Sequence, residues 1–384
     1  MPNNLPVFIS ECGDYDPERI KNLLRSAFES IGIDRKLIEG KKVLIKPNLV
    51  LAKKPEHGAT THPSFIQAAA EVLHELGASS ITAADSPGGP FNAQSLSIVY
   101  RTCGIAPLES NILKINSDFT YKSVRMNGVK LKNLHVINAF AECDVIVDIC
   151  KLKTHTLTQM SCATKNLFGI IPGVEKFEMH SNFPRIEDFS EMLVDLTEYV
   201  LREKEFIAVC DAVVSMEGNG PSYGTPKKTG LLLVSRSPFS LDIVSEHIID
   251  SDGSVQYLDC ASKRGLVTRS AEEIPVIGMQ NYPIFDFKKP DTDSGKFLKK
   301  LPDLFGGKLA AFFETKPAVN PKKCIGCGVC ARSCPRHTIE IITKKGKKLA
   351  KINRENCIKC YCCGELCPIG AVDAKQNALI KLIH

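Results

Sequence analysis

Two cysteine runs near the C-terminus constrain this chain more than any other part of its sequence. Both lie between residues 324 and 368, both follow the spacing C-x2-C-x2-C-x3-C-P, and 22 residues separate them. Their eight cysteines are Cys324, Cys327, Cys330, Cys334, Cys357, Cys360, Cys363 and Cys367. Cys362 is a ninth cysteine that falls outside the repeated spacing, so we expect it to pack beside the site rather than to act as a ligand.

The spacing is that of a sequence that wraps iron–sulfur clusters. Three thiolates separated by two residues each fit one tight loop, and the proline after the fourth cysteine turns the chain away. In bacterial two-cluster ferredoxins the last cysteine of each run ligates the other cluster. We therefore predict two [4Fe-4S] clusters, one on Cys324, Cys327, Cys330 and Cys367 and the other on Cys357, Cys360, Cys363 and Cys334. Zinc ribbons use pairs of cysteines, and disulfides require an oxidising compartment, so neither alternative is favoured.

The rest of the composition is that of a soluble protein with more than one domain. The chain has 384 residues, of which 43% are hydrophobic and 24% charged. No apolar run approaches the roughly 20 residues of a membrane span, and the N-terminus does not resemble a signal peptide, so we expect a cytoplasmic protein. The seven remaining cysteines stand singly, and we expect buried, inert thiols at Cys12, Cys103, Cys143, Cys150, Cys162, Cys210 and Cys260.

Charge is concentrated in the C-terminal part. From Pro321 onward there are 13 Lys/Arg against 4 Asp/Glu, whereas the preceding 320 residues carry a net charge of −3. Lys344, Lys345, Lys347 and Lys348 crowd the turn between the cysteine runs. This patch suits a soluble, acidic electron-carrier protein, and a solvated hairpin tip is an equally weighted alternative. Nucleic acid is not favoured, because no aromatic residues are interleaved with the lysines.

Alternating strand and helix patterns predict an α/β fold for the larger part of the chain. We predict an α/β domain with a mostly parallel sheet over 1–286, a linker over 287–320 and a small α+β two-cluster domain over 321–384. Strands are expected at 5–9, 43–45, 80–84, 144–149, 206–210 and 230–235, and helices near 17–31, 63–76, 92–102, 186–203 and 239–250. The linker could hold one short amphipathic helix, and 339–353 reads as a hairpin that turns at Gly346.

Polar residues gather where the predicted strands end. The candidates are Lys46, Asn48, Ser86, Gly88, Gly89, Lys151, Lys153, His155, Lys165, Asn166, Gly169 and Glu217. Ligands of open α/β sheets bind at the carboxyl ends of the strands. Several lysines beside glycine-rich turns therefore predict an anionic substrate, either a carboxylate or a phosphate.

No nucleotide motif supports a more specific assignment. The Pro87-Gly88-Gly89 turn lacks the Gly-Lys-Ser/Thr of a phosphate-binding loop, and no G-x-G-x-x-G follows a strand. A metal site at His155, His180 and Cys162 is possible, but packed polar residues are the favoured interpretation. For Lys153 and Lys165, a binding site and a solvated face are equally weighted.

Four segments resemble the domain of unknown function 362 family. They are VLIKPNLV (43–50), THPSFIQAAAEVLHELGA (61–78), DVIVDICKLKTHTLTQMSCATKNLFGIIPG (144–173) and DAVVSMEGNGP (211–221), in that order. The likeness covers about residues 5–250, and the cysteine-rich tail is similar to that of members that carry one. The resemblance implies an iron–sulfur protein of anaerobic or microaerobic microbes. It also implies a shared site at Lys46, Asn48, Lys153, His155, Lys165, Asn166, Gly169, Glu217 and Gly220.

The leading hypothesis is an oxidoreductase in which clusters pass electrons to a substrate or cofactor on the α/β domain. Lys46, Lys153 and Lys165, with Asn48 and Asn166, would hold the anionic group, and His155 or Glu217 would supply protons. The alternative is a non-enzymatic electron-transfer or cofactor-assembly partner whose large domain only docks another protein. A metal-handling role for His155 and His180 is the third hypothesis.

Overall fold

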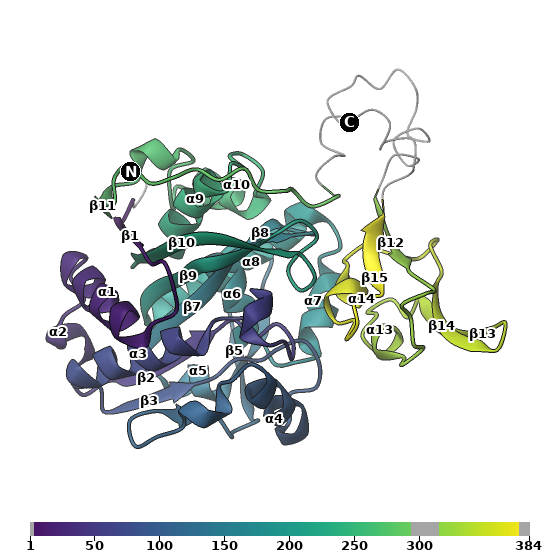
Figure 1. Cartoon of the computed structure of the whole chain (residues 1–384), viewed down its shortest axis with the longest axis horizontal. Helices are drawn as coiled ribbons and strands as arrows, with labels where there is room; N and C mark the ends of the chain where they lie inside the picture. Colours follow the sequence, from purple (N-terminus) through teal and green to yellow (C-terminus); the bar gives the residue numbers. More distant parts are fainter. Residues whose placement is uncertain (1–3, 293–314, 376–384) are drawn as a thin grey trace.

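A mixed nine-stranded sheet runs through the larger of two domains in the computed structural model, which describes residues 4–292 and 315–375 (Figure 1). The strand order is β11-β1-β10-β9-β7-β2-β3-β4, and β8 pairs with β7. The strands are β1 (Val7–Glu11), β2 (Lys42–Pro47), β3 (Ser80–Ala83), β4 (Lys114–Ile115), β7 (Val145–His155), β8 (Gln159–Ser161), β9 (Glu205–Glu217), β10 (Thr225–Ser235) and β11 (Val276–Gly278).

The central strands are parallel and the outer ones are mixed. Strands β4, β3, β2, β7 and β9 run in one direction, so their carboxyl ends meet at one edge of the sheet. Strand β10 is antiparallel to both β9 and β1. The predicted α/β class with a mostly parallel sheet is confirmed.

Helices cover both faces of this sheet. One face carries α1 (Pro17–Ser30), α3 (Pro63–Glu75) and α4 (Ala93–Thr102), and the other carries α5 (Asn138–Glu142), α6 (Ala163–Asn166), α8 (Ile186–Glu203), α9 (Pro238–Ile248) and α10 (Gln256–Lys263). Strand β7 serves both cores, because successive side chains point to opposite faces. Val145 and Val147 enter the first core, and Ile146 and Cys150 enter the second.

Helix α1 shows how local sequence sets these elements. Asp16 caps the helix by accepting a hydrogen bond from the Arg19 amide at 2.7 Å, and Pro17 occupies the first turn, where a missing N–H costs nothing. Ile20, Leu24 and Phe28 recur at helical spacing and are buried.

The smaller elements complete the larger domain. They are α2 (Arg35–Ile38), α7 (Glu175–Asn182), the hairpin β5 (Tyr121–Arg125) and β6 (Asn133–Ile137), and the short 3-10 helices η1 (Pro55–His57), η2 (Ala106–Leu108), η3 (Leu167–Ile170) and η4 (Ala271–Glu273). The strand predicted at 144–149 extends to His155, so three of the candidate residues lie within β7 itself. In the described part of the chain, no helix is long and apolar enough to cross a membrane.

The small domain is built on two antiparallel strand pairs and two helical turns. Its elements are β12 (Lys316–Val319), α13 (Val329–Arg332), β13 (Ile339–Lys344), β14 (Lys347–Ile352), α14 (Cys362–Glu365) and β15 (Val372–Lys375). The predicted hairpin is confirmed, with β13 pairing to β14 around Lys345-Gly346. Strand β12 falls within the range predicted as a linker and pairs with β15. The short helix predicted for that linker lies largely outside the described residues.

Candidate functional site

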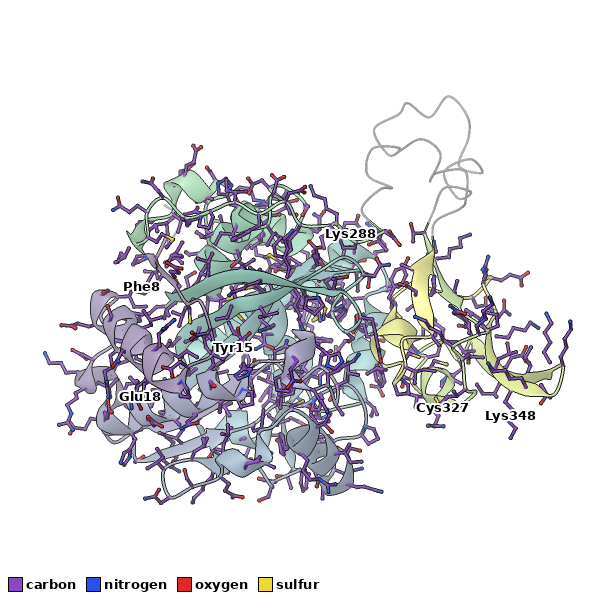
Figure 2. All side chains as sticks on the ribbon, viewed as in Figure 1. Phe8, Tyr15, Glu18, Lys288, Cys327 and Lys348 are labelled. Carbon is purple, nitrogen blue, oxygen red and sulfur yellow. The ribbon has the colours of Figure 1, made fainter. Side chains whose placement is uncertain are left out.

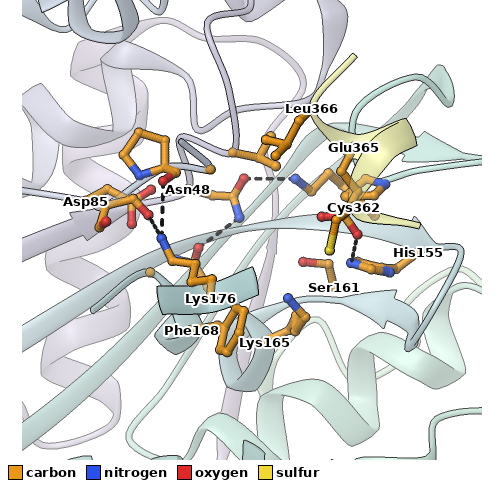
Figure 3. A pocket seen from close by; sticks show the side chains of 18 of the residues that line it. Asn48, Asp85, His155, Ser161, Lys165, Phe168, Lys176, Cys362, Glu365 and Leu366 are labelled. Atoms are coloured by element: carbon orange, nitrogen blue, oxygen red, sulfur yellow. Dashed lines mark hydrogen bonds and ion pairs between the residues drawn. The ribbon is translucent and has the colours of Figure 1, made fainter. Parts of the chain in front are cut away.

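A pocket lies at the junction of the two domains, at the carboxyl edge of the sheet (Figure 3). Its empty space is about 640 Å³, including the mouth that opens to solvent. The α/β domain contributes the ends of β2, β3 and β7 and the segment from α6 to α7. The small domain contributes Cys362, Glu365 and Leu366, at and directly after α14. The candidate site therefore belongs to both domains.

Lys46 lies beneath the pocket and does not line it. Its ammonium is fully buried, 2.8 Å from Asp85 Oδ1, and donates to the carbonyl of Pro47 at 2.9 Å. A Cβ atom at Gly169 would stand 2.1 Å from Asp85 Oδ1 and 2.6 Å from Lys46 Nζ, so only glycine fits against this ion pair. The structure gives Lys46 a supporting position.

Lys153 and two asparagines form a fixed platform along one wall. The Lys153 ammonium donates to Asn48 Oδ1 and to the Ala59 carbonyl, each at 2.8 Å. Asn48 Nδ2 donates to Asn166 Oδ1 at 2.8 Å, and Asn166 Nδ2 donates to Asp148 Oδ1 at 2.8 Å. Burial, with the neighbouring lysine charges, lowers the pKa of Lys153 to about 7. The sequence-predicted residues Asn48, Lys153 and Asn166 are thus brought together.

Lys176 on α7 is a second pocket lysine, and it stands in no motif from which a site could be predicted. Its ammonium donates to the carbonyls of Ser86 and Pro87, in the glycine-rich turn after β3. Burial lowers its pKa to about 7. The turn at 86–89 therefore accepts these hydrogen bonds through the carbonyls of its first two residues.

Lys165 differs from the other pocket lysines because its ammonium has no hydrogen-bond acceptor among the described residues. It lies 4.5 Å from the centre of the Phe168 ring, a cation–π contact. Burial lowers the pKa of Lys165, and the carboxylate of Glu365 opposes that shift. Its unused N–H groups are available to an anion in the pocket.

His155 faces Glu365 across the domain boundary. The amide of Leu157 donates to His155 Nδ1 at 3.0 Å, so the neutral ring carries its proton on Nε2. Nε2 is 3.3 Å from Glu365 Oε1 (Figure 3). Burial, followed by the charges of Lys165 and Lys153, holds the pKa of His155 well below its ordinary value. Burial raises the pKa of Glu365 against the effect of the same two lysines.

Two further polar groups on the pocket wall form no side-chain hydrogen bond within the described residues. They are the hydroxyl of Ser161 and the imidazole of His180, both almost completely buried. The His180 ring stacks on Phe189 with centroids 4.5 Å apart, and burial lowers its pKa to about 3. A neutral imidazole and a hydroxyl can hydrogen-bond a ligand beside Lys165.

Glu217 is not brought together with His155. Its carboxylate is 2.8 Å from Lys227 Nζ and accepts a hydrogen bond from the Lys288 amide at 3.0 Å, and it does not line the pocket. The neighbouring Gly220 packs against β7, where a Cβ would stand 2.1 Å from the Thr154 carbonyl oxygen. This segment therefore contributes backbone packing and the pocket residue Pro221.

The eight spaced cysteines lie in the small domain, where neighbouring thiols affect one another's pKa. Burial raises the pKa of Cys330 to about 11, and the nearby thiols of Cys367, Cys327 and Cys324 add to it. The thiol of Cys363 is similarly surrounded by those of Cys360, Cys357, Cys330 and Cys334. Cys367 is thus a neighbour of Cys330 and Cys334 a neighbour of Cys363, as the predicted crossed ligand sets require, and Cys330 itself lies near Cys363. Ligation itself stays a prediction.

The backbone around these thiols fits iron–sulfur clusters. Amides donate to sulfur from Ala371 to Cys367 at 3.1 Å and from Ala350 to Cys324 at 3.4 Å. Such N–H groups stabilise the charge on cluster sulfurs. The loops repeat the same turns, since Gly326 and Gly328 in the first run and Lys359 and Tyr361 at the matching positions of the second all have positive φ.

The small domain is fixed to the α/β domain beside the pocket. The Tyr223 hydroxyl donates to the carbonyl of Cys367 across the boundary, and within the α/β domain the Lys53 ammonium lies 3.6 Å from the Tyr223 ring centre. A Cβ atom at Gly88 would meet Leu366 Cδ2 at 2.3 Å. The glycine-rich turn at 86–89 thus has a second role, because the absence of a side chain at Gly88 leaves space for Leu366.

In the comparison with known proteins, a family model matches each of the two domains. The model of the family described as "Domain of unknown function (DUF362)" matches residues 43–246, and that of the 4Fe-4S dicluster domain matches residues 317–374. The thylakoid-associated protein sll1697 of Synechocystis sp. is 27% identical over 287 residues, covering 72% of this chain and 85% of that protein.

Solved structures show a more distant likeness. A Thermotoga maritima protein aligns with a TM-score of 0.38 and 12% identity, over 60% of this chain and 57% of that one. The lactate racemase apoprotein of Thermoanaerobacterium thermosaccharolyticum aligns with a TM-score of 0.41 and 12% identity, over 66% and 59%. The chain spans less than two thirds of either. The matched segment carries most of the pocket wall and covers more than half of the chain, which therefore belongs to the DUF362 family and carries a 4Fe-4S ferredoxin-type domain.

Proposed function

We propose that this protein is an iron–sulfur oxidoreductase that exchanges electrons with an anionic substrate or cofactor held in the interdomain pocket. The observation that supports this most directly is the position of α14. One helical turn contains the predicted cluster ligand Cys363 and also places Cys362 and Glu365 in the pocket wall. A ligand in the pocket is thereby adjacent to the cluster-binding loop.

Lys165 is the group that anchors the anion. Its ammonium has no acceptor among the residues that the structure describes, and charge-assisted hydrogen bonds to a carboxylate or phosphate are stronger than neutral ones. The other lysines act through their charge, because Lys153 and Lys176 already donate to protein oxygens. Ser161 and His180 supply neutral hydrogen bonds, and Phe168 provides an apolar wall.

His155 and Glu365 form the pair that holds and supplies protons. Backbone amides donate to His155 Nδ1, which leaves the ring proton on Nε2, 3.3 Å from Glu365 Oε1, and the raised pKa of Glu365 favours a carboxyl group that can hold a proton. A substrate that gains electrons in this pocket can then gain a proton from the same wall. Glu217 has no part in this proposal, because it lies outside the pocket.

Two [4Fe-4S] clusters, when bound to the eight cysteines, supply or accept single electrons beside the pocket. We propose that an acidic, soluble carrier docks at the basic tip of the β13–β14 hairpin. Lys344, Lys345, Lys347 and Lys348 are exposed there, and Figure 2 shows Lys348 near the far end of the small domain, away from the α/β domain. None of the sixteen cysteines forms a disulfide, which suits a reducing compartment such as the cytoplasm.

The test begins with anaerobic reconstitution of the full chain, iron quantitation and EPR of the reduced protein. We expect about eight irons per chain and two interacting clusters. Small carboxylates and inorganic phosphate are then titrated into the wild type, Lys165→Ala and the exposed control Lys263→Ala. The proposal predicts ligand-dependent spectra in the wild type and control, and at least tenfold weaker binding in Lys165→Ala at unchanged iron content.

A non-enzymatic electron-transfer partner is the second candidate, and the basic hairpin favours it. In that case no anion alters the spectra of any variant, while an acidic carrier protein still binds and is released by salt. That result would overturn the pocket proposal and leave the cluster assignment standing. About four irons or fewer after reconstitution would instead contradict the cross-ligation of the eight cysteines.

A further inference from the structure

Three cysteines that stand far apart in the sequence meet in the core of the α/β domain. Cys150 lies on β7, Cys162 directly before α6, and Cys210 on β9, and each is fully buried. Their sulfur atoms all lie within 4.8 Å of one another. Cys162 Sγ is 3.6 Å from Cys150 Sγ and 3.7 Å from Cys210 Sγ.

The fold holds these thiols in place from three directions. Strands β7 and β9 pair Cys150 directly with Cys210 in their parallel register, so both side chains leave the sheet on one face. The turn between β7 and β8 brings the chain back over that face to Cys162. Asp242 on α9 then fixes the segment by accepting hydrogen bonds from the amides of Ala163 at 2.8 Å and Thr164 at 3.0 Å.

The spacing of the sulfurs suits a single metal ion. A tetrahedral zinc site with Zn–S bonds of about 2.3 Å places its sulfurs about 3.8 Å apart. The separations of Cys162 Sγ from the other two sulfurs are within a few tenths of an ångström of that value. The sulfur ligands of an iron–sulfur cluster bind different irons and stand farther apart, so a third cluster does not fit here.

A buried carboxyl group also lies beside the three thiols. Asp242 is fully buried beside Cys162, and its hydrogen bonds come from two amides and from the hydroxyl of Tyr257, all neutral donors. In the described part of the chain, no lysine, arginine or histidine forms an ion pair with it. Buried carboxylates are ordinarily paired with a cation or close to a metal.

We propose that Cys150, Cys162 and Cys210 form a buried site for one thiophilic d10 cation, Zn²⁺ or Cu⁺. Thiolate ligands select these ions over harder ones. The site joins β7 and β9 to the segment that carries Lys165 and Asn166, three and four residues after Cys162. The metal therefore cross-links these segments and stabilises the structure behind the pocket. This proposal does not depend on the function proposed for the pocket.

Metal analysis of the full chain tests the site. Zinc, copper and iron are quantified together by mass spectrometry in the wild type, in Cys162→Ala and Cys210→Ala, and in the control Cys260→Ala. Cys260 is also a buried thiol of this core but is not one of the three. We expect about one zinc or copper per chain in the wild type and control, at least fivefold less in the two site variants, and unchanged iron. The element that is lost distinguishes Zn²⁺ from Cu⁺.

Cobalt substitution gives a second, spectroscopic readout of the same site. Growth with Co²⁺ should produce a thiolate-to-cobalt charge-transfer band that Cys162→Ser lacks and Cys260→Ser keeps. Three results would each overturn the proposal: less than a tenth of an equivalent of zinc plus copper in the folded wild type, metal retained in Cys162→Ala, or metal lost on changing Cys324 but not Cys162. A Cys150–Cys162 disulfide in thiol-trapped protein would overturn it as well.

Discussion

The two domains of this protein are held together by different physical means. The α/β domain has two apolar cores, one on each face of its sheet, filled with aliphatic and aromatic side chains. The core of the small domain contains eight buried residues, and four of them are cysteines: Cys324, Cys330, Cys363 and Cys367. Small domains with so little buried apolar surface are commonly stabilised by disulfides or bound metal. We infer that metal coordination stabilises the small domain and that apolar burial stabilises the large one.

The largest effect should come from a single cluster cysteine. Cys363→Ala removes a predicted ligand, so we expect loss of at least four irons and unfolding of the small domain, because metal binding and folding are coupled. Hydrogen exchange should show loss of protection over 315–375, while β7 and β9 keep theirs. Cys362→Ala is the matched control and should retain its iron. Full hydrogen-exchange protection of the small domain in the absence of iron would show that metal coordination does not stabilise it.

A core substitution in the large domain should destabilise that domain and leave the iron content unchanged. Leu193 on α8 is fully buried, and Leu193→Ala should lower the free energy of unfolding of this domain by about 3 kcal/mol. Urea unfolding followed by far-ultraviolet circular dichroism measures the change, with iron content determined in parallel. Iron content should stay at the wild-type level. Loss of iron on this substitution would show that the two domains unfold as one unit.

The pocket between the domains should respond to pH near neutrality. The pKa values of Lys153 and Lys176 are lowered to about 7, so both are largely charged at pH 6 and largely neutral at pH 8. The affinity for an anion should therefore fall about tenfold as pH rises from 6 to 8, or ~1.4 kcal/mol.

Isothermal titration with a carboxylate whose own pKa is below 5 measures this change. Lys153→Met removes one of the titrating charges, so its profile should be flatter than that of the wild type. An affinity that stays constant between pH 6 and pH 8 would contradict the lowered lysine pKa values.

The smallest effect is expected at the hairpin tip. Lys348→Glu reverses an exposed charge far from the pocket, so the rate of reduction by an acidic carrier should fall about threefold at low salt. The difference should vanish at high ionic strength, since screening removes the interaction between exposed charges. Stopped-flow absorbance follows the reaction, with the solvent-exposed lysine Lys263 changed to Glu on the other domain as the control. Equal rates for the two variants would count against the docking site.

Much of the fold could be predicted from local patterns. Helices α1, α3, α4, α8 and α9 have clear caps or apolar periodicity, and the β13–β14 hairpin has a turn at Lys345-Gly346. The hairpin β5–β6 and helix α10 were missed, because short half-exposed strands and an eight-residue helix carry little periodic signal. The strand at 144–149 was predicted too short, since Lys151, Lys153 and His155 are polar residues within a fully buried strand.

The candidate site was predicted in outline only. Asn48, Lys153, His155, Lys165 and Asn166 meet at the pocket because parallel strands share one carboxyl edge. The roles of the lysines could not be predicted, since they depend on which carbonyl or carboxylate lies within reach of each ammonium. Lys46 forms an ion pair with Asp85 below the pocket, and Glu217 forms one with Lys227 outside it. Lys176 lines the pocket although no sequence motif indicates it.

The sequence by itself determined which cysteines are the predicted cluster ligands, because the spacing of ligands around a cluster is local and repeats along the chain. It also determined the α/β class, because hydrophobic periodicity is local. Only the tertiary structure placed Glu365 and Cys362 against Lys165 and brought Cys150, Cys162 and Cys210 within reach of one ion. Those contacts join residues 12 to 200 positions apart, so they depend on strand register and domain docking, which no short stretch of sequence contains.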